Sequence, residues 1–287
     1  MAEFALQGRA ALVTGAARGI GFETARLLHQ RGASVVVCDI DPAATERAAG
    51  RIGERALAFP ADVTDGEAMA AAVDAAVEAY GALDLVVANA GVGPSGQTMK
   101  AMDLSVFERT LEIDLLGVVR TVHPALDQIA RRGGQVVVIS SVYAFATGSL
   151  VTPYAAAKAG VEALGRALRV ELAPHGAGAT VAHFGFVDTT MVQEATEKSE
   201  RDDVLESLPA FVRRRLTPAQ AATALVDGIE RRAPRVIAPG WWKVPYYLRG
   251  VFGPLMDKLT SRDERVLQAM RDGDVPDPEA RHTSTAG

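Results

Sequence analysis

The 287-residue sequence has a single cysteine, Cys38, so it forms neither an internal disulfide nor a cluster of thiolate metal ligands. It also lacks the run of about 18 apolar residues that a membrane-spanning helix needs. The amino-terminal stretch has an acid at Glu3 and no basic region followed by a long apolar run, so no signal peptide is predicted. We expect a cytoplasmic protein in which Cys38, inside the apolar run 34–38, is buried and unreactive.

An excess of basic charge is absent as well. The chain has 30 Lys and Arg against 35 Asp and Glu, and no stretch concentrates the basic residues, which argues against a nucleic-acid partner. The five histidines are scattered and none lies at metal-ligand spacing from acids or the cysteine, so no metal site is predicted. His183 is interpreted as a packing residue. The composition, 48% hydrophobic and 23% charged, is that of an ordinary globular chain, and its length suits one large α/β domain.

Short β-branched runs alternate along the chain with longer Ala-rich stretches of helical period. The runs are apolar on both faces, as the strands of a covered parallel sheet are. The helical stretches between them, of roughly 10–25 residues, are long enough for right-handed crossovers. The pattern predicts a doubly wound α/β domain over residues 1–240 with ligands at the carboxyl ends of the strands. The predicted strands are Ala10–Thr14, Ser34–Asp39, Ala56–Phe59, Leu83–Ala88, Gln135–Ser140, Thr180–Phe184 and Arg235–Ala238.

Two regions interrupt this alternation. Residues 191–216 are charged but contain scattered apolar side chains, and a loop of that length inside a compact domain predicts a lid over the site. Residues 241–271 form an aromatic extension, in which both tryptophans and two of the five tyrosines fall within Trp241–Tyr247. This segment either packs on a sister subunit or the substrate pocket, or contacts a membrane interface through residues 241–252. The polar residues 272–287 predict a disordered tail.

The first predicted strand runs into a loop with Gly15, Gly19 and Gly21 and then a helix over Phe22–Gln30. Glycines let the backbone turn tightly and approach a pyrophosphate, whose charge is met by the N–H groups at the helix start. Asp39 ends the second strand, where an acid would bind the adenosine ribose hydroxyls and repel a 2′-phosphate. NAD is therefore favoured over NADP. Arg18 is the opposing consideration, because a guanidinium pairs well with phosphate.

A possible catalytic set follows. Tyr154 and Lys158 are four residues apart in a helical stretch, so they share one face, and Ser141 closes the fifth strand at the ligand-binding edge. A phenol with a pKa of about 10 is a poor proton carrier at neutral pH, and a neighbouring ammonium lowers that pKa. The spacing predicts that Tyr154 passes a proton, that Lys158 lowers its pKa, and that Ser141 holds the substrate oxygen.

Taken together, these motifs resemble the shorter-chain, NAD-dependent branch of the short-chain dehydrogenase/reductase family over roughly residues 5–240. The resemblance implies a seven-stranded parallel sheet, a homotetramer or homodimer, and hydride transfer between NAD(H) and a secondary alcohol or ketone. It implies that Tyr154 is the acid/base, that Ser141 orients the substrate, and that Lys158 also bonds the nicotinamide ribose. The further residues that it implies for cofactor binding are Gly15, Arg18, Gly19, Ile20, Gly21, Asp39, Asp62, Val63, Asn89, Ala90, Gly91, Val187 and Thr189.

Several of these residues have plainer interpretations. Asp62 could begin a turn, Asn89 could bond its own backbone, and Thr189 could cap a helix. The sequence also departs from the family in two places. Asp114 stands where the family has an asparagine that supports a water relay, and an ionised acid cannot donate a hydrogen bond; its charge could stabilise the Lys158 ammonium or raise the pKa of the phenol. Phe184 replaces a proline that stiffens the start of the lid.

The leading hypothesis is an NAD-dependent enzyme, and the aromatic extension favours a bulky hydrophobic ketone or secondary alcohol as substrate. An NADP-dependent ketone reductase is the nearest alternative. A catalytically weakened nucleotide-binding or sensing protein is the alternative of another class, and Asp114 is its main support. The complete set Ser141, Tyr154 and Lys158 favours the enzyme.

Overall fold

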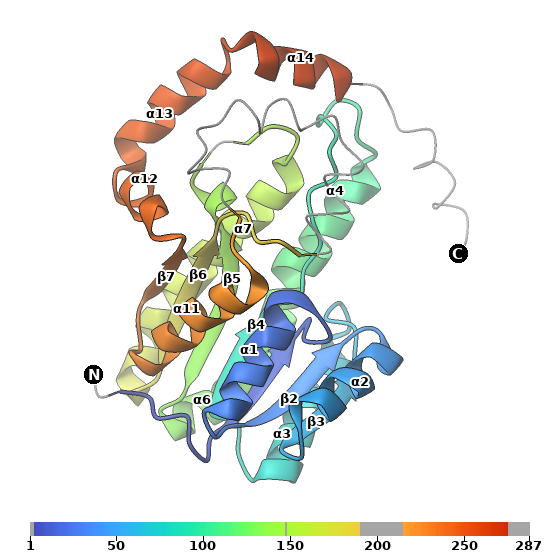
Figure 1. The fold of residues 1–287 in the computed structure, drawn as a ribbon, viewed down its shortest axis with the longest axis vertical. Helices are drawn as coiled ribbons and strands as arrows, with labels where there is room; N and C mark the ends of the chain where they lie inside the picture. Colours follow the sequence, from blue (N-terminus) through green and yellow to red (C-terminus); the bar gives the residue numbers. More distant parts are fainter. Residues whose placement is uncertain (1–2, 147, 190–214, 275–287) are drawn as a thin grey trace.

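The computed structural model describes residues 3–146, 148–189 and 215–274, and one sheet forms its centre (Figure 1). All seven strands of this sheet are parallel to their neighbours. The predicted doubly wound α/β fold with a seven-stranded parallel sheet is therefore confirmed. The strands are β1 (Ala10–Thr14), β2 (Ser34–Asp39), β3 (Ala56–Pro60), β4 (Leu85–Ala88), β5 (Gln135–Ser141), β6 (Gly178–Phe184) and β7 (Arg235–Ala238).

The strand order is β3-β2-β1-β4-β5-β6-β7. The chain builds outward from β1 in one direction as far as β3, then returns to the other side of β1 and builds outward from β4. This reversal between β1 and β4 opens a crevice at the carboxyl ends of the strands, the usual ligand position in such sheets.

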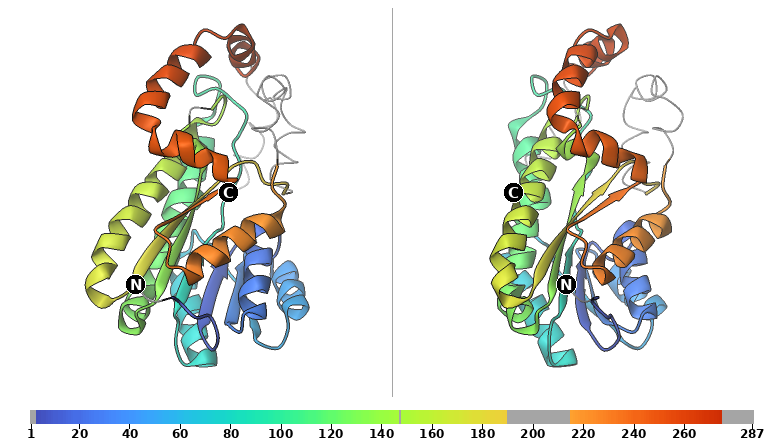
Figure 2. Two further views of the ribbon diagram at one scale, coloured as in Figure 1. Left: turned by 60° about the vertical axis from the view of Figure 1, so that its left-hand side comes forward. Right: turned by 90° about the vertical axis from the view of Figure 1, so that its left-hand side faces the viewer.

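Helices cover both faces of the sheet, because alternate strand residues point to opposite sides and both sides are apolar. Val13 and Val35 pack into one core layer with α1 and α11, whereas Leu12 and Val36 pack into the other with α3 and α7. Figure 2 shows the two helical layers. The helices of the main domain are α1 (Gly19–Gln30), α2 (Pro42–Ile52), α3 (Gly66–Tyr80), α4 (Leu104–Leu111), α5 (Gly117–Val122), α6 (Leu126–Arg132), α7 (Thr152–Leu172) and α11 (Pro218–Glu230).

Five predicted boundaries differ from the structure by one to three residues. Strands β3 and β5 end one residue later than predicted, and β6 begins two residues earlier. Helix α1 begins at Gly19 instead of Phe22, so the last glycines of the loop already belong to its first turn. Strand β4 begins at Leu85 instead of Leu83. The buried carboxylate of Asp84 accepts a hydrogen bond from the backbone N–H of Ala10 at 3.1 Å and pairs with Arg9 at 2.6 Å, so this residue anchors the strand entry.

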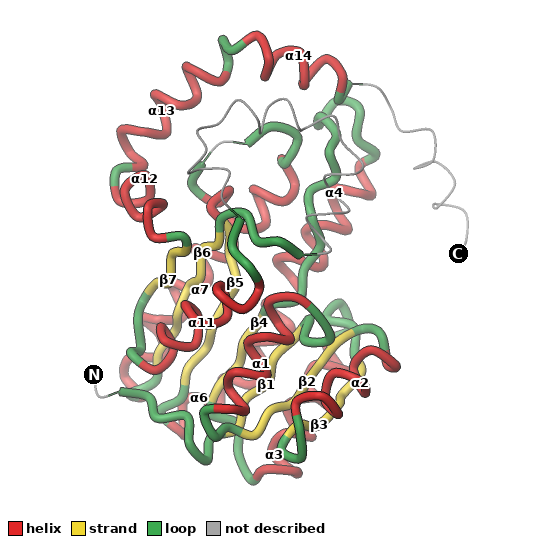
Figure 3. Tube along the Cα trace, viewed as in Figure 1, coloured by secondary structure: helices red, strands yellow, loops and turns green. Residues whose placement is uncertain are grey.

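The carboxyl-terminal extension forms an arch over the end of the sheet at which the strands finish (Figures 1 and 3). Its far end is attached to the loop before α4, where the Asp274 carboxylate accepts from Thr98 Oγ1 at 2.6 Å and lies 2.9 Å from Lys100 Nζ. None of the described helices is long and apolar enough to cross a membrane. The extension consists of a short turn (Gly240–Trp242), α12 (Lys243–Tyr247), α13 (Arg249–Thr260) and α14 (Glu264–Asp272).

Two predicted segments fall mostly outside the described residues. Of the predicted lid, 191–216, the structure describes only Arg215 and Leu216, and Leu216 forms an isolated parallel bridge with Val187. Of the predicted tail, 272–287, Asp272 ends α14 and Asp274 makes the contacts above, so the ordered chain continues beyond the expected start of the tail. The remainder of both segments lies outside the described residues.

Candidate active site

A cleft of roughly 420 Å³ opens at the reversal of strand order, along the carboxyl ends of β1, β4, β5 and β6. Two of the residues predicted from the sequence, Gly21 and Asp114, lie behind its lining. All the others line it: Gly15, Arg18, Gly19, Ile20, Asp39, Asp62, Val63, Asn89, Ala90, Gly91, Ser141, Tyr154, Lys158, Val187 and Thr189.

The three loop glycines are required for different reasons. Gly15 and Gly19 have φ of +62° and +59°, a left-handed conformation that glycine adopts without steric cost. Gly21 has an ordinary conformation, but a Cβ there would clash with the carbonyl oxygen of Gly15. The amide of Asn89 fixes the same loop by donating to the carbonyl oxygens of Thr14 at 2.9 Å and Gly15 at 3.2 Å. Asn89 therefore holds the glycine loop rather than its own backbone.

The start of α1 is suited to an anionic group. No side chain among the described residues caps its first turn, so the N–H groups there point toward the cleft without a side-chain partner. A Cβ built on Gly19 would meet only Thr189, at 3.6 Å, which leaves room for a pyrophosphate beside the loop. Arg18 is exposed at the edge of the cleft.

Asp39 lies at the tip of β2, at the far end of the same cleft. Its two carboxylate oxygens accept from the backbone N–H groups of Ala17 at 3.0 Å and Ile40 at 2.9 Å. The acid is thus held in place while it lines the cleft. An open helix terminus at one end and a fixed carboxylate at the other fit a nicotinamide dinucleotide.

For Asp62 and Val63 the sequence leaves open a turn before a helix or a place in the cofactor site, and the structure is compatible with both. The Asp62 carboxylate accepts from the backbone N–H of Thr64 at 2.8 Å, so it shapes the turn before α3, and the residue also lines the cleft. Arg109, from α4, lines the cleft too and lies 3.8 Å from Asp62. Arg109 lies in no recognisable motif, so its position in the cleft was not predictable from the sequence.

Ser141, Tyr154 and Lys158 meet at the other end of the cleft. Ser141 is the last residue of β5, and Tyr154 and Lys158 lie one turn apart near the start of α7. The Ser141 hydroxyl forms a hydrogen bond with Tyr154. The ammonium Nζ of Lys158 lies 5.4 Å from the centre of the Tyr154 ring and 3.4 Å from the carbonyl oxygen of Ile139. The phenol, the hydroxyl and the ammonium are therefore within reach of one bound group.

Asp114 contacts Lys158 from outside the lining of the cleft. It lies in a π-helical turn, Glu112–Leu116, between α4 and α5, and such turns are frequent at functional sites. Its Oδ2 is 3.1 Å from Lys158 Nζ, and its Oδ1 accepts from the backbone N–H of Val92 at 2.7 Å. A Cβ on Gly91 would come within 3.3 Å of both charged groups, so glycine there permits their approach. The result is a buried ion pair beside the phenol.

This environment raises the pKa of Tyr154 above its ordinary value. Burial is the largest cause, and the Asp114 charge adds to it, while the Lys158 ammonium and the Ser141 hydroxyl act in the opposite direction. Burial lowers the pKa of Lys158, but Asp114 and Tyr154 outweigh it, so that pKa is raised. Lys158 acts on the pKa of the phenol in the predicted direction, but burial outweighs it and the Asp114 charge adds to the burial, so the expectation of an acidic phenol is wrong.

Aromatic side chains pack in series from the Tyr154 ring. Tyr143 lies edge-to-face against Tyr154 with ring centres 6.3 Å apart, and Phe186 lies edge-to-face against Tyr143 at 6.4 Å. Tyr143 follows Ser141 by two residues, and Phe186 follows the end of β6 by two residues. The sequence analysis did not select either residue, although an aromatic residue just beyond a strand end is the available signal.

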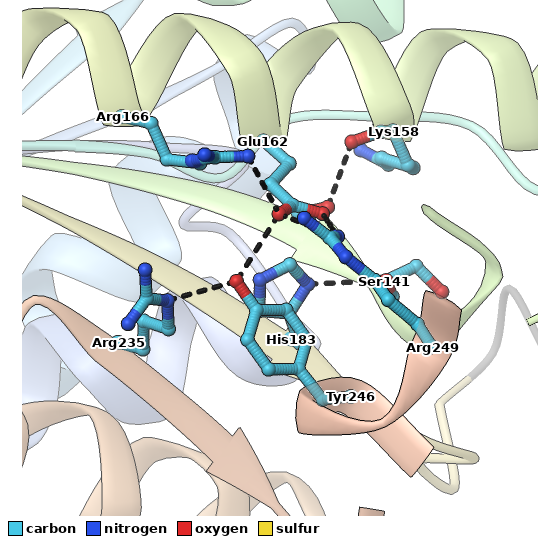
Figure 4. A network of polar contacts seen from close by, with 9 residues as sticks. Ser141, Lys158, Glu162, Arg166, His183, Arg235, Tyr246 and Arg249 are labelled. Atoms are coloured by element: carbon cyan, nitrogen blue, oxygen red, sulfur yellow. Dashed lines mark hydrogen bonds and ion pairs between the residues drawn. The ribbon is translucent and has the colours of Figure 1, made fainter. Parts of the chain in front are cut away.

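A second buried charge lies on α7 one turn beyond Lys158. The carboxylate of Glu162 is 4% exposed and accepts from Arg249 Nη1 at 2.8 Å and from the Tyr246 hydroxyl at 3.1 Å (Figure 4). The Tyr246 hydroxyl in turn accepts from Arg235 Nε at 2.8 Å. The first turns of the extension are therefore attached directly to the helix that carries Tyr154 and Lys158.

His183 connects the same contacts to Ser141. Burial lowers the pKa of His183, so the ring is neutral, and its Nδ1 lies 3.3 Å from the carbonyl oxygen of Ser141. The ring packs against Phe145 with centres 5.6 Å apart and against Tyr246 at 5.2 Å. His183 packs in the core, as expected, and it also supports the strand end that carries Ser141.

Comparison with known proteins agrees with this geometry. The model of the short-chain dehydrogenase family matches residues 9–200. The cis-4-hydroxycyclohexanecarboxylate dehydrogenase of Sinomonas cyclohexanicum is 40% identical over 187 residues, which cover 64% of this chain and 75% of that protein. The cyclohexanol dehydrogenase of Acinetobacter sp. (strain SE19) is 34% identical over 193 residues, covering 66% of this chain and 77% of that protein.

A solved structure shares the fold. The crystal structure of a short-chain type dehydrogenase/reductase from Mycobacterium marinum superimposes with a TM-score of 0.74 at 26% identity, covering 83% of this chain and 96% of that one. Because the family model spans most of the chain and the sheet carries the expected cleft, the protein belongs to the short-chain dehydrogenase family and is an oxidoreductase that acts on CH–OH or C=O groups.

Proposed function

We propose that the protein interconverts a secondary alcohol and its ketone on a hydrophobic ring substrate, with NAD as the cofactor. The observation that carries the proposal is the meeting of Ser141, Tyr154 and Lys158 in one cleft, beside the aromatic side chains of Tyr143 and Phe186. Aromatic and apolar walls suit a saturated ring better than a polar sugar. The names of two relatives, which act on cyclohexane alcohols, support the same substrate class.

A bound nicotinamide dinucleotide supplies the hydride-transfer chemistry. Ser141 Oγ and the Tyr154 hydroxyl hold the substrate oxygen between them. In the direction of reduction, the Tyr154 hydroxyl donates its proton to the carbonyl oxygen. In the direction of oxidation, the Tyr154 phenolate accepts the proton of the alcohol, and the Lys158 ammonium stabilises that phenolate. Because the pKa of Tyr154 is raised, the phenol carries its proton at neutral pH, which favours reduction there and oxidation at alkaline pH.

Replacement of Tyr154 tests this mechanism. Tyr154→Phe removes the only proton that the mechanism transfers, so turnover of cyclohexanone and cyclohexanol should fall by about 10²–10⁴-fold. Binding of NADH, followed by fluorescence, should stay close to that of the unmodified protein. The matched control is Tyr80→Phe, at the end of α3 and outside the cleft lining, which should keep its activity. Turnover that survives in Tyr154→Phe would remove the proposed role of the phenol.

The preference for NAD is supported by Asp39, whose fixed carboxylate would repel a 2′-phosphate. Asp39→Asn removes the charge and keeps one acceptor oxygen, so the amide can accept from only one of the Ala17 and Ile40 N–H groups. The ratio of KM for NADP to KM for NAD should fall at least about tenfold, the effect of roughly 1.4 kcal/mol. Asp41→Asn, the same change two residues further on, is the control. An unchanged ratio in Asp39→Asn, with NADP binding lost in Arg18→Gln, would favour NADP instead.

We also propose that copies of the chain associate as a dimer or tetramer in the cytoplasm. Leu104, Leu116 and Val119, along the stretch from α4 to α5, are 59%, 42% and 37% exposed, and burial against another copy would remove them from water. The one thiol, Cys38, is buried and unpaired, which suits a reducing compartment. Light scattering on the purified protein measures the mass of the assembly.

A further inference from the structure

Helix α13 stands clear of the rest of the molecule along most of its length (Figures 1 and 2). The arch is attached to the described part of the domain at its two ends, where Tyr246 and Arg249 bind Glu162 and where Asp274 binds the loop before α4, and Asp257 between them also has an interaction partner. Between these ends every residue from 254 to 259 is exposed. A helix of this length that contains two glycines and Pro254 is only marginally stable in water. Its stability therefore calls for a partner that covers it.

The exposed face of this helix is apolar. Within α13, Val251, Leu255, Met256 and Leu259 recur at helical spacing and, at about 100° per residue, cover somewhat more than a third of the helix circumference. Exposed apolar residues also lie on α12 and at Leu248, where the two helices are separated. The face on α13 is wider than the narrow seam with which one helix packs into a coiled coil. The residues, with their exposed fractions, are Val244 (57%), Tyr247 (66%), Leu248 (48%), Val251 (74%), Leu255 (49%), Met256 (42%) and Leu259 (56%).

Basic side chains flank this apolar face. Between Trp241 and Arg262 there are four basic residues and one acidic residue, so the stretch carries +3 in a chain whose net charge is −5. Arg249 is paired with Glu162, whereas Lys243, Lys258 and Arg262 are exposed. A wide apolar face with an exposed tyrosine, Tyr247, at its start and basic residues around it is typical of helices that lie in a membrane interface.

We propose that α12 and α13 dock the protein on an anionic lipid bilayer, with the apolar face inserted among the acyl chains and the basic residues at the phosphate groups. The apolar residues that form this surface are the seven given above. The arch lies over the end of the sheet where the cleft opens, so docking brings the cleft close to the lipid, into which a hydrophobic substrate partitions (Figure 1). Docking itself does not depend on the proposed function.

The test uses the full-length protein and sedimentation with vesicles. We expect binding to vesicles of phosphatidylcholine with about 30% phosphatidylglycerol and weaker binding to phosphatidylcholine alone. Salt at about 0.5 M should weaken the binding to the anionic vesicles and leave the binding to phosphatidylcholine close to unchanged. Val251→Glu and Leu255→Glu should each lower the partition coefficient at least about tenfold. Val170→Glu is the matched control, because Val170 on α7 has the same exposed fraction as Val251, 74%, and lies outside the arch.

The other outcomes overturn the proposal. The proposal is overturned if the unmodified protein binds neither kind of vesicle. It is also overturned if Val170→Glu loses as much vesicle binding as Val251→Glu does. If Val251→Glu lowers the mass of the assembly while the unmodified protein ignores vesicles, the face covers another copy of the chain instead. Oxidation of water-soluble cyclohexanol without vesicles should be unchanged in Val251→Glu. An unmodified protein that binds vesicles but lacks this activity would contradict the proposed function and leave the docking intact.

Discussion

Asp114 places a carboxylate 3.1 Å from the Lys158 ammonium, in a position with no exposure to solvent. A buried charge is tolerated only when it is paired and hydrogen-bonded, and Lys158 together with the Val92 N–H supplies both partners. The pairing has a chemical consequence, because the ammonium that stabilises the Tyr154 phenolate is shared with the Asp114 carboxyl group, whose own pKa burial raises. The weakened-enzyme alternative thus has a physical basis, but it predicts an altered pH profile rather than lost chemistry.

The charge of Asp114 can be removed with little change in the size of the side chain. Asp114→Asn removes an anion that raises the pKa of Tyr154 and of Lys158, so both pKa values should fall. Oxidation of the alcohol needs the phenolate, so the rising limb of its kcat/KM profile should move to lower pH, and the rate at neutral pH should increase severalfold. Reduction, which needs the phenol, should lose activity at a lower pH than before.

The control is Glu112→Gln in the same π-helical turn. Glu112 pairs with Arg120 at 2.7 Å and takes no part in the pKa shift of Tyr154, so the profile should stay in place. A profile of Asp114→Asn that coincides with that of the unmodified protein, or moves to higher pH, would show that Asp114 does not set the pKa of the phenol.

At the scale of elements, Tyr246 joins α12 to α7 and β7 through one hydroxyl that donates to Glu162 and accepts from Arg235. Tyr246→Phe keeps the ring against His183 but leaves Glu162 and Arg235 without this partner. Hydrogen bonds to charged groups contribute about 1.5–3 kcal/mol, so the free energy of unfolding in urea should fall by about that amount. Tyr247→Phe, at a neighbouring residue that is 66% exposed and whose hydroxyl meets Arg235 but not Glu162, should cost less. Equal losses in both variants would argue against a special role for Tyr246.

Elements whose cause is local were predictable from the sequence. Strands β1, β2 and β7 match their predicted bounds because each is a β-branched run between turn residues, and the fold class follows from their alternation with helices. Residues in contiguous motifs, from Gly15 to Thr189, were predicted to surround one ligand, and they line one cleft. The contact between Glu162 and Tyr246 joins residues 84 positions apart, so no spacing rule reveals it.

The π-helical turn is a further feature that periodicity misses. Glu112–Leu116 inserts into what the sequence presents as one continuous helix, and it directs Asp114 toward Lys158. Similarly, the sign of the pKa shift at Tyr154 depends on burial and on three charged or polar neighbours from different elements. Sequence patterns identify which groups meet, whereas the balance of their charges requires the distances between them.

At the scale of the whole molecule, the extension divides into two parts with different physical roles. Its first part, through Arg249, completes the surroundings of buried Glu162 and packs on His183 behind Ser141. Its second part, α13 and α14, makes few contacts and presents the apolar face. The first part therefore contributes to the stability of the domain, and the second part to its interactions.

Three truncated chains separate these roles. A chain that ends at Gly240 leaves Glu162 with only Arg166, at 3.7 Å, and breaking a buried ion pair costs about 3–5 kcal/mol. Its melting temperature should fall by roughly 10 °C. A chain that ends at Gly250 keeps Tyr246 and Arg249, so it should melt close to the full-length protein while losing vesicle binding. A chain that ends at Asp274 should keep both properties.

Calorimetry measures the melting temperature of each of the three chains, and sedimentation measures their binding to vesicles. Because Arg249 and Tyr246 are the only contacts to Glu162 that differ between the chains ending at 240 and 250, a difference in melting temperature between them measures the buried network together with the adjacent tryptophans. If the chain ending at Gly250 melts as low as the one ending at Gly240, the distant contact of Asp274 with Thr98 carries the stability instead. The arch would then be a structural strap that closes over the cleft, and its apolar face would have to be covered from within the same molecule.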